Sequence, residues 1–203
     1  MVITDGMNVF ERAIKRVFDF VCSFLGLVLL SPVFLLVYIM LRIQNEGSVI
    51  FKQERIGYKR KPFNIYKFRT MRVNSEDDGM PKLAEKKDKR LTKVGRFLRE
   101  HHLDELPQLF NVLKGDMSFV GPRPERQYFI DLIKKENPDY DYIFLMRPGL
   151  TSMATIHNGY TDTMEKMLTR LKMDLEYLQK RSLWLDAKLI FTTAFYIVNG
   201  KKF

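Results

Sequence analysis

Two adjacent carboxylates, Asp104 and Glu105, open a motif that ends in a proline-rich turn carrying one arginine. From Leu103 to Pro124 the chain reads LDELPQLFNVLKGDMSFVGPRP. The apolar spacing i, i+3, i+4, i+7 predicts one buried helical face, formed by Leu106, Leu109, Phe110 and Leu113. Both carboxylates fall in the first turn, where free N–H groups and the helix dipole favour the ionised form. Because adjacent helical residues point about 100° apart, the pair can serve one site in two different roles.

Several cations are expected to converge on these carboxylates. Lys67 lies in an alternating segment, 63–69, that predicts a strand, and Arg99 precedes Asp104 near the end of a predicted helix. Arg123 stands in the Gly-Pro-Arg-Pro turn, and Arg147 begins a second rigid turn, of a kind that can present N–H groups to an anion. Carboxylate oxygens without histidine or cysteine suit Mg²⁺, which bridges protein carboxylates to substrate phosphates.

These ingredients indicate phosphoryl-transfer chemistry. An aspartate can attack phosphorus and carry the group covalently, while arginine and metal stabilise the charge that develops. The 34 Lys and Arg against 24 Asp and Glu give a net charge of +10, which suits an anionic partner. The sequence contains no GxGxxG, Walker, CxxC or HExxH motif, which removes the common nucleotide-loop and zinc interpretations.

A membrane element precedes the predicted site. Residues 20–41 contain no charge, and a helix of that length spans about 33 Å, close to the thickness of a bilayer core. Ser31 and Pro32 interrupt it, and proline bends a helix by removing a hydrogen bond. Both flanks are basic, whereas the positive-inside rule expects asymmetry for a spanning helix. The residues alone leave two topologies open, a spanning helix and a re-entrant helix–break–helix that returns to the cytoplasmic side.

The predicted fold is α/β and mainly helical. It combines the broken membrane helix, a small β-hairpin made by strands at 49–51 and 63–69, and interfacial amphipathic helices. The last helix, uncharged from 189 to 199 and carrying Trp184, is expected to lie on the membrane interface, with an ordinary buried helix as the alternative. We expect a membrane part over residues 1–46 and a cytoplasmic catalytic domain over 47–203.

The motif at 104–124 resembles the signature of the bacterial sugar transferases, the monotopic phosphoglycosyl transferases that prime polysaccharide and glycoconjugate assembly. The resemblance extends over nearly the whole chain and includes the Ser-Pro break, the segments Gly-Ser-Val-Ile-Phe and Ile-Tyr-Lys-Phe-Arg-Thr-Met, and Arg-Pro-Gly-Leu-Thr. In length the chain is similar to the small members of that family. By this resemblance the Ser31–Pro32 break is re-entrant, which places both ends of the chain at the cytoplasmic face of the bacterial inner membrane.

The resemblance also implies a reaction and a set of roles. A UDP-sugar donates its phosphosugar to undecaprenyl phosphate and UMP is released. Asp104 is then the nucleophile and Glu105 the magnesium ligand, while Arg123 binds phosphate and Lys67 and Arg99 line the same anionic site. Residues 152–160 depart from the Gly-Trp-Ala-Gln-Val-Asn-Gly-Arg segment of many members, which leaves the transferred sugar open.

Two other function classes stay open on the residues alone. One is a membrane-anchored module that binds anions without catalysis, and the other is a glycosyltransferase that releases UDP. Nucleic acid is not expected as a partner, because the cations surround carboxylates and do not form a stripe with exposed aromatic residues. The sequence does not determine the glycan pathway, and a homo-oligomer stays possible.

Overall fold

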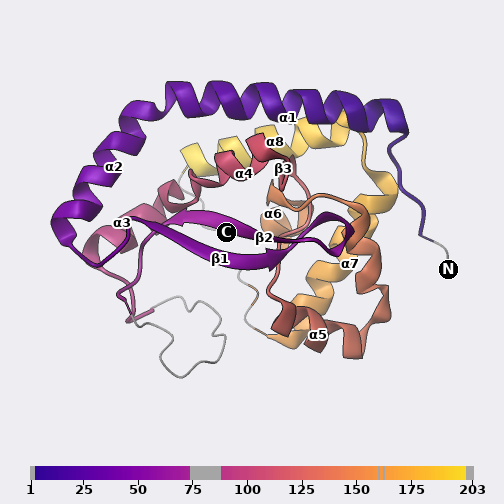
Figure 1. Cartoon of the computed structure of the whole chain (residues 1–203). Helices are drawn as coiled ribbons and strands as arrows, with labels where there is room; N and C mark the ends of the chain where they lie inside the picture. The colour runs from indigo at the N-terminus through magenta and orange to yellow at the C-terminus, as the bar shows by residue number, and fades with distance from the viewer. Residues whose placement is uncertain (1–2, 74–87, 160, 162, 200–203) are drawn as a thin grey trace.

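A long helix with one sharp bend covers one side of the molecule (Figure 1). The computed structural model describes residues 3–73, 88–159, 161 and 163–199. Helices α1 (Val9–Leu29) and α2 (Ser31–Gln44) meet at an angle of 59°. No single helix among the described residues has the length and hydropathy to cross a bilayer, but this bent pair satisfies both criteria together.

The bend lies where the sequence predicts it. Leu30 separates the two helices, and Pro32 falls in the first turn of α2, where its missing N–H costs no helical hydrogen bond. The hydroxyl of Ser31 donates to the carbonyl of Val28 at 2.7 Å, which satisfies one of the free carbonyls at the end of α1. The predicted break at Ser31–Pro32 is therefore confirmed as a bend between two helices.

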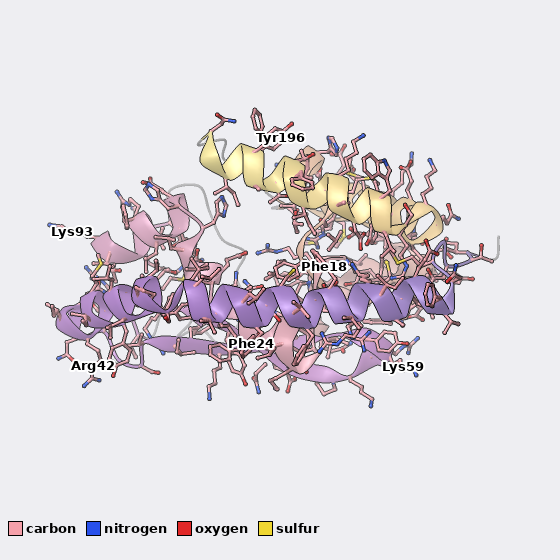
Figure 2. All side chains as sticks on the ribbon, turned by 90° about the horizontal axis from the view of Figure 1, so that it is seen from above. Phe18, Phe24, Arg42, Lys59, Lys93 and Tyr196 are labelled. Carbon is pink, nitrogen blue, oxygen red and sulfur yellow. The ribbon has the colours of Figure 1, made fainter. Side chains whose placement is uncertain are left out.

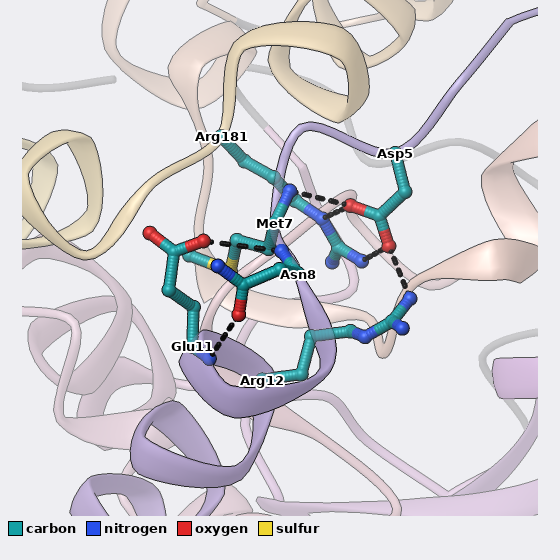
Figure 3. Close-up of polar contacts among 6 residues, drawn as sticks. All are labelled: Asp5, Met7, Asn8, Glu11, Arg12 and Arg181. Atoms are coloured by element: carbon teal, nitrogen blue, oxygen red, sulfur yellow. Dashed lines mark hydrogen bonds and ion pairs between the residues drawn. The ribbon is translucent and has the colours of Figure 1, made fainter.

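The beginning of α1 is fixed by a capping box and by an ion-pair cluster (Figure 3). The side chain of Asn8 accepts from the backbone N–H of Glu11 at 2.9 Å, and the Glu11 carboxylate accepts from the backbone N–H of Asn8 at 3.1 Å. The carboxylate of Asp5 binds the guanidinium groups of Arg12 and Arg181. These contacts attach the start of α1 to the chain segment that follows α7 (Met164–Lys180).

The predicted hairpin is present and is longer than its sequence pattern. Strands β1 (Ile50–Ile56) and β2 (Pro62–Phe68) pair antiparallel. The turn η1 (Tyr58–Arg60) joins them, with φ of 55° at Lys59. Ile65 and Phe68 of β2 are buried, so this hairpin forms part of the core next to α4 (Gln108–Lys114).

A second, parallel pair of strands was not predicted. β3 (Ser118–Val120) pairs with β4 (Gly149–Thr151), with Ser118 opposite Gly149 and Val120 opposite Thr151. The sequence pattern at residues 147–152 predicts a turn. The chain there is extended because β4 completes its hydrogen bonds on β3, a distant partner that no local pattern in either segment reveals.

The predicted helix at 103–114 is divided in two, and its predicted buried face is confirmed in part, because Leu109 is buried and Leu106 and Leu113 are half-buried. A 3₁₀ turn, η2 (Leu103–Glu105), comes first, and α4 begins after Pro107. Phe110 is 48% exposed, whereas Asn111 is fully buried and Val112 is too. Asn111 accepts from the N–H of Tyr66 at 3.0 Å and donates to the carbonyl of Asn64 at 2.7 Å. Asn111 is buried because the hairpin supplies backbone partners for its side chain. A pattern of apolar residues cannot predict this burial.

The remaining helices complete the fold around one main core. They are α3 (Lys93–Glu100), α5 (Gln127–Glu136), the 3₁₀ segment η3 (Pro138–Leu145), α6 (Met153–Asn158), α7 and α8 (Leu183–Val198). The core lies among α5, η3, α7 and β3, and includes Val120, Ile133, Phe144, Leu171 and Leu178.

Helices α1 and α8 lie side by side on the same face of the molecule (Figures 1 and 2). Both helices expose large apolar side chains, including Phe10 and Val17 of α1 and Trp184, Phe191 and Phe195 of α8. The inner side of α1 packs on α4, where the guanidinium of Arg16 donates to the carbonyls of Val112 and Leu113 at 2.7 and 2.8 Å. Arg16 thereby satisfies free carbonyl groups at the C-terminus of α4.

Candidate functional site

The two carboxylates lie in the 3₁₀ turn η2, immediately after His102, which has a left-handed backbone with φ of 55°. This turn carries Asp104 into the interior, where it is only 6% exposed. Glu105 points toward β2, where the ammonium group of Lys67 lies 2.5 Å from its carboxylate. The alternation of β2 places Lys67 on the same side as buried Ile65, so the hairpin brings this cation to the carboxylates.

A cleft open to solvent adjoins this ion pair. Lys67 and Glu105 line it together with two arginines, Arg55 of β1 and Arg123 of the proline-rich turn. The amide of Gln108 and the hydroxyl groups of Ser152 and Thr155 contribute neutral polar groups, while Ile65 and Leu150 supply apolar surface. With three cations and one ion-paired carboxylate on its walls, the cleft favours an anionic ligand.

The two neighbouring carboxylates have opposite electrostatic environments. Burial raises the pKa of Asp104, and the negative charge of Glu105 adds to that increase, while Lys67 and Arg99 oppose it. Burial would also raise the pKa of Glu105, but Lys67 and Arg123 outweigh it and lower that pKa to about 2. Glu105 is therefore the permanently ionised member of the pair, and Asp104 is the more basic one.

Asp104 also differs from Glu105 in its contacts. Within the described part of the chain, no hydrogen bond or ion pair engages the Asp104 carboxylate, whereas Glu105 is held by Lys67. Burial of a carboxylate with no direct ion pair raises the free energy of its charged form, although the nearby charges of Lys67 and Arg99 reduce that cost for Asp104. Acids with perturbed pKa values are enriched at functional sites, which makes Asp104 a candidate for one.

Not every predicted cation reaches the cleft. Arg99 lies on α3, close enough to Asp104 for its charge to lower the pKa of that carboxyl group. Arg147 lies outside the cleft: its Nε donates to the carbonyl of Gly115 at 2.9 Å, and its guanidinium stacks over the ring of Tyr58 at 5.0 Å. The structure therefore places Lys67, Arg99 and Arg123 at or beside the carboxylates and gives Arg147 contacts elsewhere.

Sequence reasoning did not identify Arg55, although its side chain lines the cleft. Its guanidinium donates to the carbonyl of Pro124 at 3.2 Å and lies 3.4 Å from the Glu125 carboxylate, which also pairs with Arg170 at 2.7 Å. In the sequence Arg55 belongs to a basic stretch that was interpreted only as a membrane flank. The hairpin register is the signal that could have identified Arg55, because it pairs Arg55 of β1 with Phe63 of β2. Phe63 and Lys67 share one face of β2, so the register places Arg55 on the same face as Lys67.

The residues of the site fit one kind of metal binding. The described residues contain no group of three or more His, Cys, Asp or Glu side chains placed to hold a metal ion. Asp104 and Glu105 offer two carboxylates, and Mg²⁺ is commonly held by one or two carboxylates together with water and substrate phosphates. The donor set therefore suits magnesium that arrives with a phosphorylated ligand and does not suit a closed, all-protein metal site.

Asp104 does not line the cleft itself but is adjacent in the chain to Glu105, which does. A cleft with Lys67, Arg55 and Arg123 on its walls is typical of proteins that bind phosphate groups. A family model for bacterial sugar transferases matches residues 10–200. The chain belongs to the bacterial sugar transferase family.

Three relatives show what the family includes. The chain is 43% identical, over 93% of its own length and 41% of the relative's, to a UDP-glucose:undecaprenyl-phosphate glucose-1-phosphate transferase of Klebsiella pneumoniae. It is 40% identical, over 92% and 44%, to a UDP-N-acetylgalactosamine-undecaprenyl-phosphate N-acetylgalactosaminephosphotransferase of Aeromonas hydrophila. A glucose-1-phosphate transferase of Caulobacter vibrioides is 40% identical over 88% and 67%. The chain thus spans less than half the length of the first two relatives.

Proposed function

We propose that this chain transfers a sugar 1-phosphate from a UDP-sugar to undecaprenyl phosphate and releases UMP. The different contacts of the two carboxylates are the main support for this proposal, because they suit one carboxylate to act as a nucleophile and the other to stay ionised. Asp104 is buried, basic and unpaired among the described residues, whereas Glu105 is ionised and held by Lys67. The named relatives act on UDP-sugars and undecaprenyl phosphate, which makes these the first substrates to test.

The proposed reaction has two displacements at the same phosphorus. In the first, a carboxylate oxygen of Asp104 forms a bond to the sugar-bearing phosphorus, and the bond to the oxygen bridging the two phosphates breaks. UMP leaves with that bridging oxygen. In the second, an oxygen of undecaprenyl phosphate attacks the same phosphorus, and the bond to Asp104 breaks. The products are UMP and undecaprenyl diphosphate sugar, and the carboxylate is regenerated.

The remaining side chains bind and orient the phosphates. Arg123 and Lys67 line the cleft and carry charges that can contact the diphosphate, and Arg99 lies beside Asp104. Arginine next to a transferring phosphoryl group stabilises the charge of the transition state. Glu105 is the proposed ligand of Mg²⁺, which when bound would neutralise phosphate charge.

The bent helix pair is the proposed membrane element. We infer that it enters one leaflet and returns, which places the cleft at the cytoplasmic face of the inner membrane. The 59° bend and the exposed apolar side chains of α1 and α8, two helices that lie side by side, support this arrangement. A lipid phosphate held at that surface would lie at the level of the protein's cationic site.

The decisive experiment compares wild type with Asp104→Asn in detergent, using a panel of UDP-sugars and undecaprenyl phosphate. Asparagine keeps the shape of the side chain and removes its nucleophilic oxygen, so UMP release should disappear while circular dichroism and melting temperature stay close to wild type. Quantifying both nucleotides separates the alternatives: UDP as product indicates a conventional glycosyltransferase, and no nucleotide product with any sugar indicates a binding module. Unchanged turnover in a folded Asp104→Asn variant would refute the covalent mechanism.

A further inference from the structure

Two charged side chains of α1 point away from its apolar surface and hold strand β3. The carboxylate of Asp19, only 2% exposed, accepts from the hydroxyl of Ser118 at 3.1 Å and from the N–H of Phe119 at 3.0 Å. The ammonium group of Lys15 donates to the carbonyl of Val120 at 3.0 Å and pairs with Asp186 of α8. Every residue of β3 is therefore bound by α1.

β3 leads directly into the turn that carries Arg123. On its far side the turn is held by β4: the N–H of Gly121 donates to the carbonyl of Thr151 at 3.0 Å, and the N–H of Gly149 donates to the carbonyl of Pro122 at 2.9 Å. A Cβ atom on Gly121 would lie 2.2 Å from the carbonyl oxygen of Arg147, so the two segments are in contact. The position of the turn therefore depends on β3, which is held by β4 on one side and by the charged side chains of α1 on the other.

The charge on Asp19 is not needed to attach α1. The helix already packs on α4 and β3, and an apolar side chain at this buried position would avoid the desolvation of a carboxylate. Burial raises the pKa of Asp19, and the positive charge of Lys15 is the main influence opposing that increase. The carboxylate orients β3, because its two hydrogen bonds to consecutive residues define both the position and the rotation of that strand.

We propose that Asp19, supported by Lys15, is a positioning residue for Arg123. The seating of α1 on β3 sets the place of the 121–124 turn, and phosphate binding in the cleft depends on that seating. The membrane-associated helix thus acts on the active site through the backbone of one short strand. This inference rests on the proposed role of Arg123 as a phosphate ligand, and its test separates the two.

The test measures binding of UDP by isothermal titration calorimetry to the full chain in detergent. Arg123→Ala should weaken UDP binding, and Asp19→Asn should weaken it by about tenfold. Both donors bind the same oxygen of Asp19, and an uncharged amide oxygen is a weaker acceptor than a carboxylate oxygen and no longer attracts Lys15. In the double variant Asp19→Asn/Arg123→Ala the affinity should equal that of Arg123→Ala alone. Such non-additivity is expected when one residue acts only through the other.

A matched control separates positioning from general loss of stability. Asp5 is also a carboxylate that fastens α1, through Arg12 and Arg181, but it does not touch β3. Asp5→Asn should therefore lower the melting temperature and leave UDP affinity within twofold of wild type. Ser118→Ala removes one of the two hydrogen bonds to Asp19. If Asp19→Asn does not fold, Ser118→Ala replaces it in the same measurements, both alone and combined with Arg123→Ala.

The possible outcomes identify which idea fails. If Arg123→Ala binds UDP as tightly as wild type, the phosphate role in the proposed function is wrong. If Arg123→Ala weakens binding but Asp19→Asn and Ser118→Ala do not, the positioning role is wrong. An Asp19→Asn effect that persists at full size in the Arg123→Ala background also overturns it, because Asp19 would then act by another route.

Discussion

Replacing Lys67 by methionine should destabilise the protein in a strongly pH-dependent way. The side chains of Lys67 and Glu105 are 20% and 27% exposed and 2.5 Å apart. A pKa lowered from 4.5 to about 2 corresponds to a preference of about 3 kcal/mol for the ionised form of Glu105 in the fold. Arg123 remains in the variant and water reaches part of the pair, so we expect a loss of about 2 kcal/mol in the free energy of unfolding at pH 7.

The direction of the pH dependence follows from the lowered pKa of Glu105. Stability gained by a carboxyl group whose pKa is lowered in the fold is fully present above its unfolded value, 4.5, and is lost as the pH falls toward about 2. In Lys67→Met, burial is left to act on Glu105 with weaker opposition, so the pKa of Glu105 rises. The part of the difference between wild type and variant that is due to Glu105 should therefore shrink progressively below pH 4.5.

Urea unfolding in detergent, followed by tryptophan fluorescence and circular dichroism at pH 3.5 and 7, measures this difference. The double variant Lys67→Met/Glu105→Gln should regain most of the stability, because it no longer contains an unpaired carboxylate. Lys52→Met, on the neighbouring strand and exposed, is the matched control and should change stability by less than about 0.5 kcal/mol. A loss for Lys67→Met that is equal at both pH values, or a double variant no more stable than the single one, would refute the reasoning.

Three further outcomes are expected. Burial raises the pKa of Asp174 to about 7, so the stability of the wild type should fall as the pH rises from 4 to 7. Asp174→Asn should lack this decrease in thermal melting at several pH values, and parallel curves for the two proteins would contradict the prediction. Gly121→Ala should lower the melting temperature by several degrees and weaken UDP binding, since its Cβ would lie 2.2 Å from the carbonyl oxygen of Arg147; a variant indistinguishable from wild type would mean that the strands separate easily. Arg147→Gln should cost about 1 kcal/mol of stability through its lost bond to Gly115 and leave UDP affinity within twofold, in contrast to Arg123→Gln; equal affinity losses in the two variants would return Arg147 to the binding site.

The sequence by itself determined the features that depend on neighbouring residues. Pro32 interrupts the long apolar helix whatever surrounds that helix, because the missing N–H and the fixed φ belong to the proline itself. The alternation at 63–69 predicted a strand of the hairpin and the side chain, Lys67, that shares a face with Ile65. The carboxylate pair and Arg123 were evident in the same way, because their residue types and spacing are readable within one short motif.

Only the tertiary structure decided the properties that depend on distant partners. Asp104 and Glu105 are adjacent and chemically alike, and their pKa values diverge because β2 brings Lys67 to one carboxylate and leaves the other buried without a partner. Asn111 is buried because the hairpin offers it backbone partners, whereas Phe110, which the apolar pattern places on the buried face, is exposed. β3 pairs with β4 across about 30 residues of chain, and Asp19 binds β3 across about 100. Local sequence patterns do not indicate which distant groups will meet.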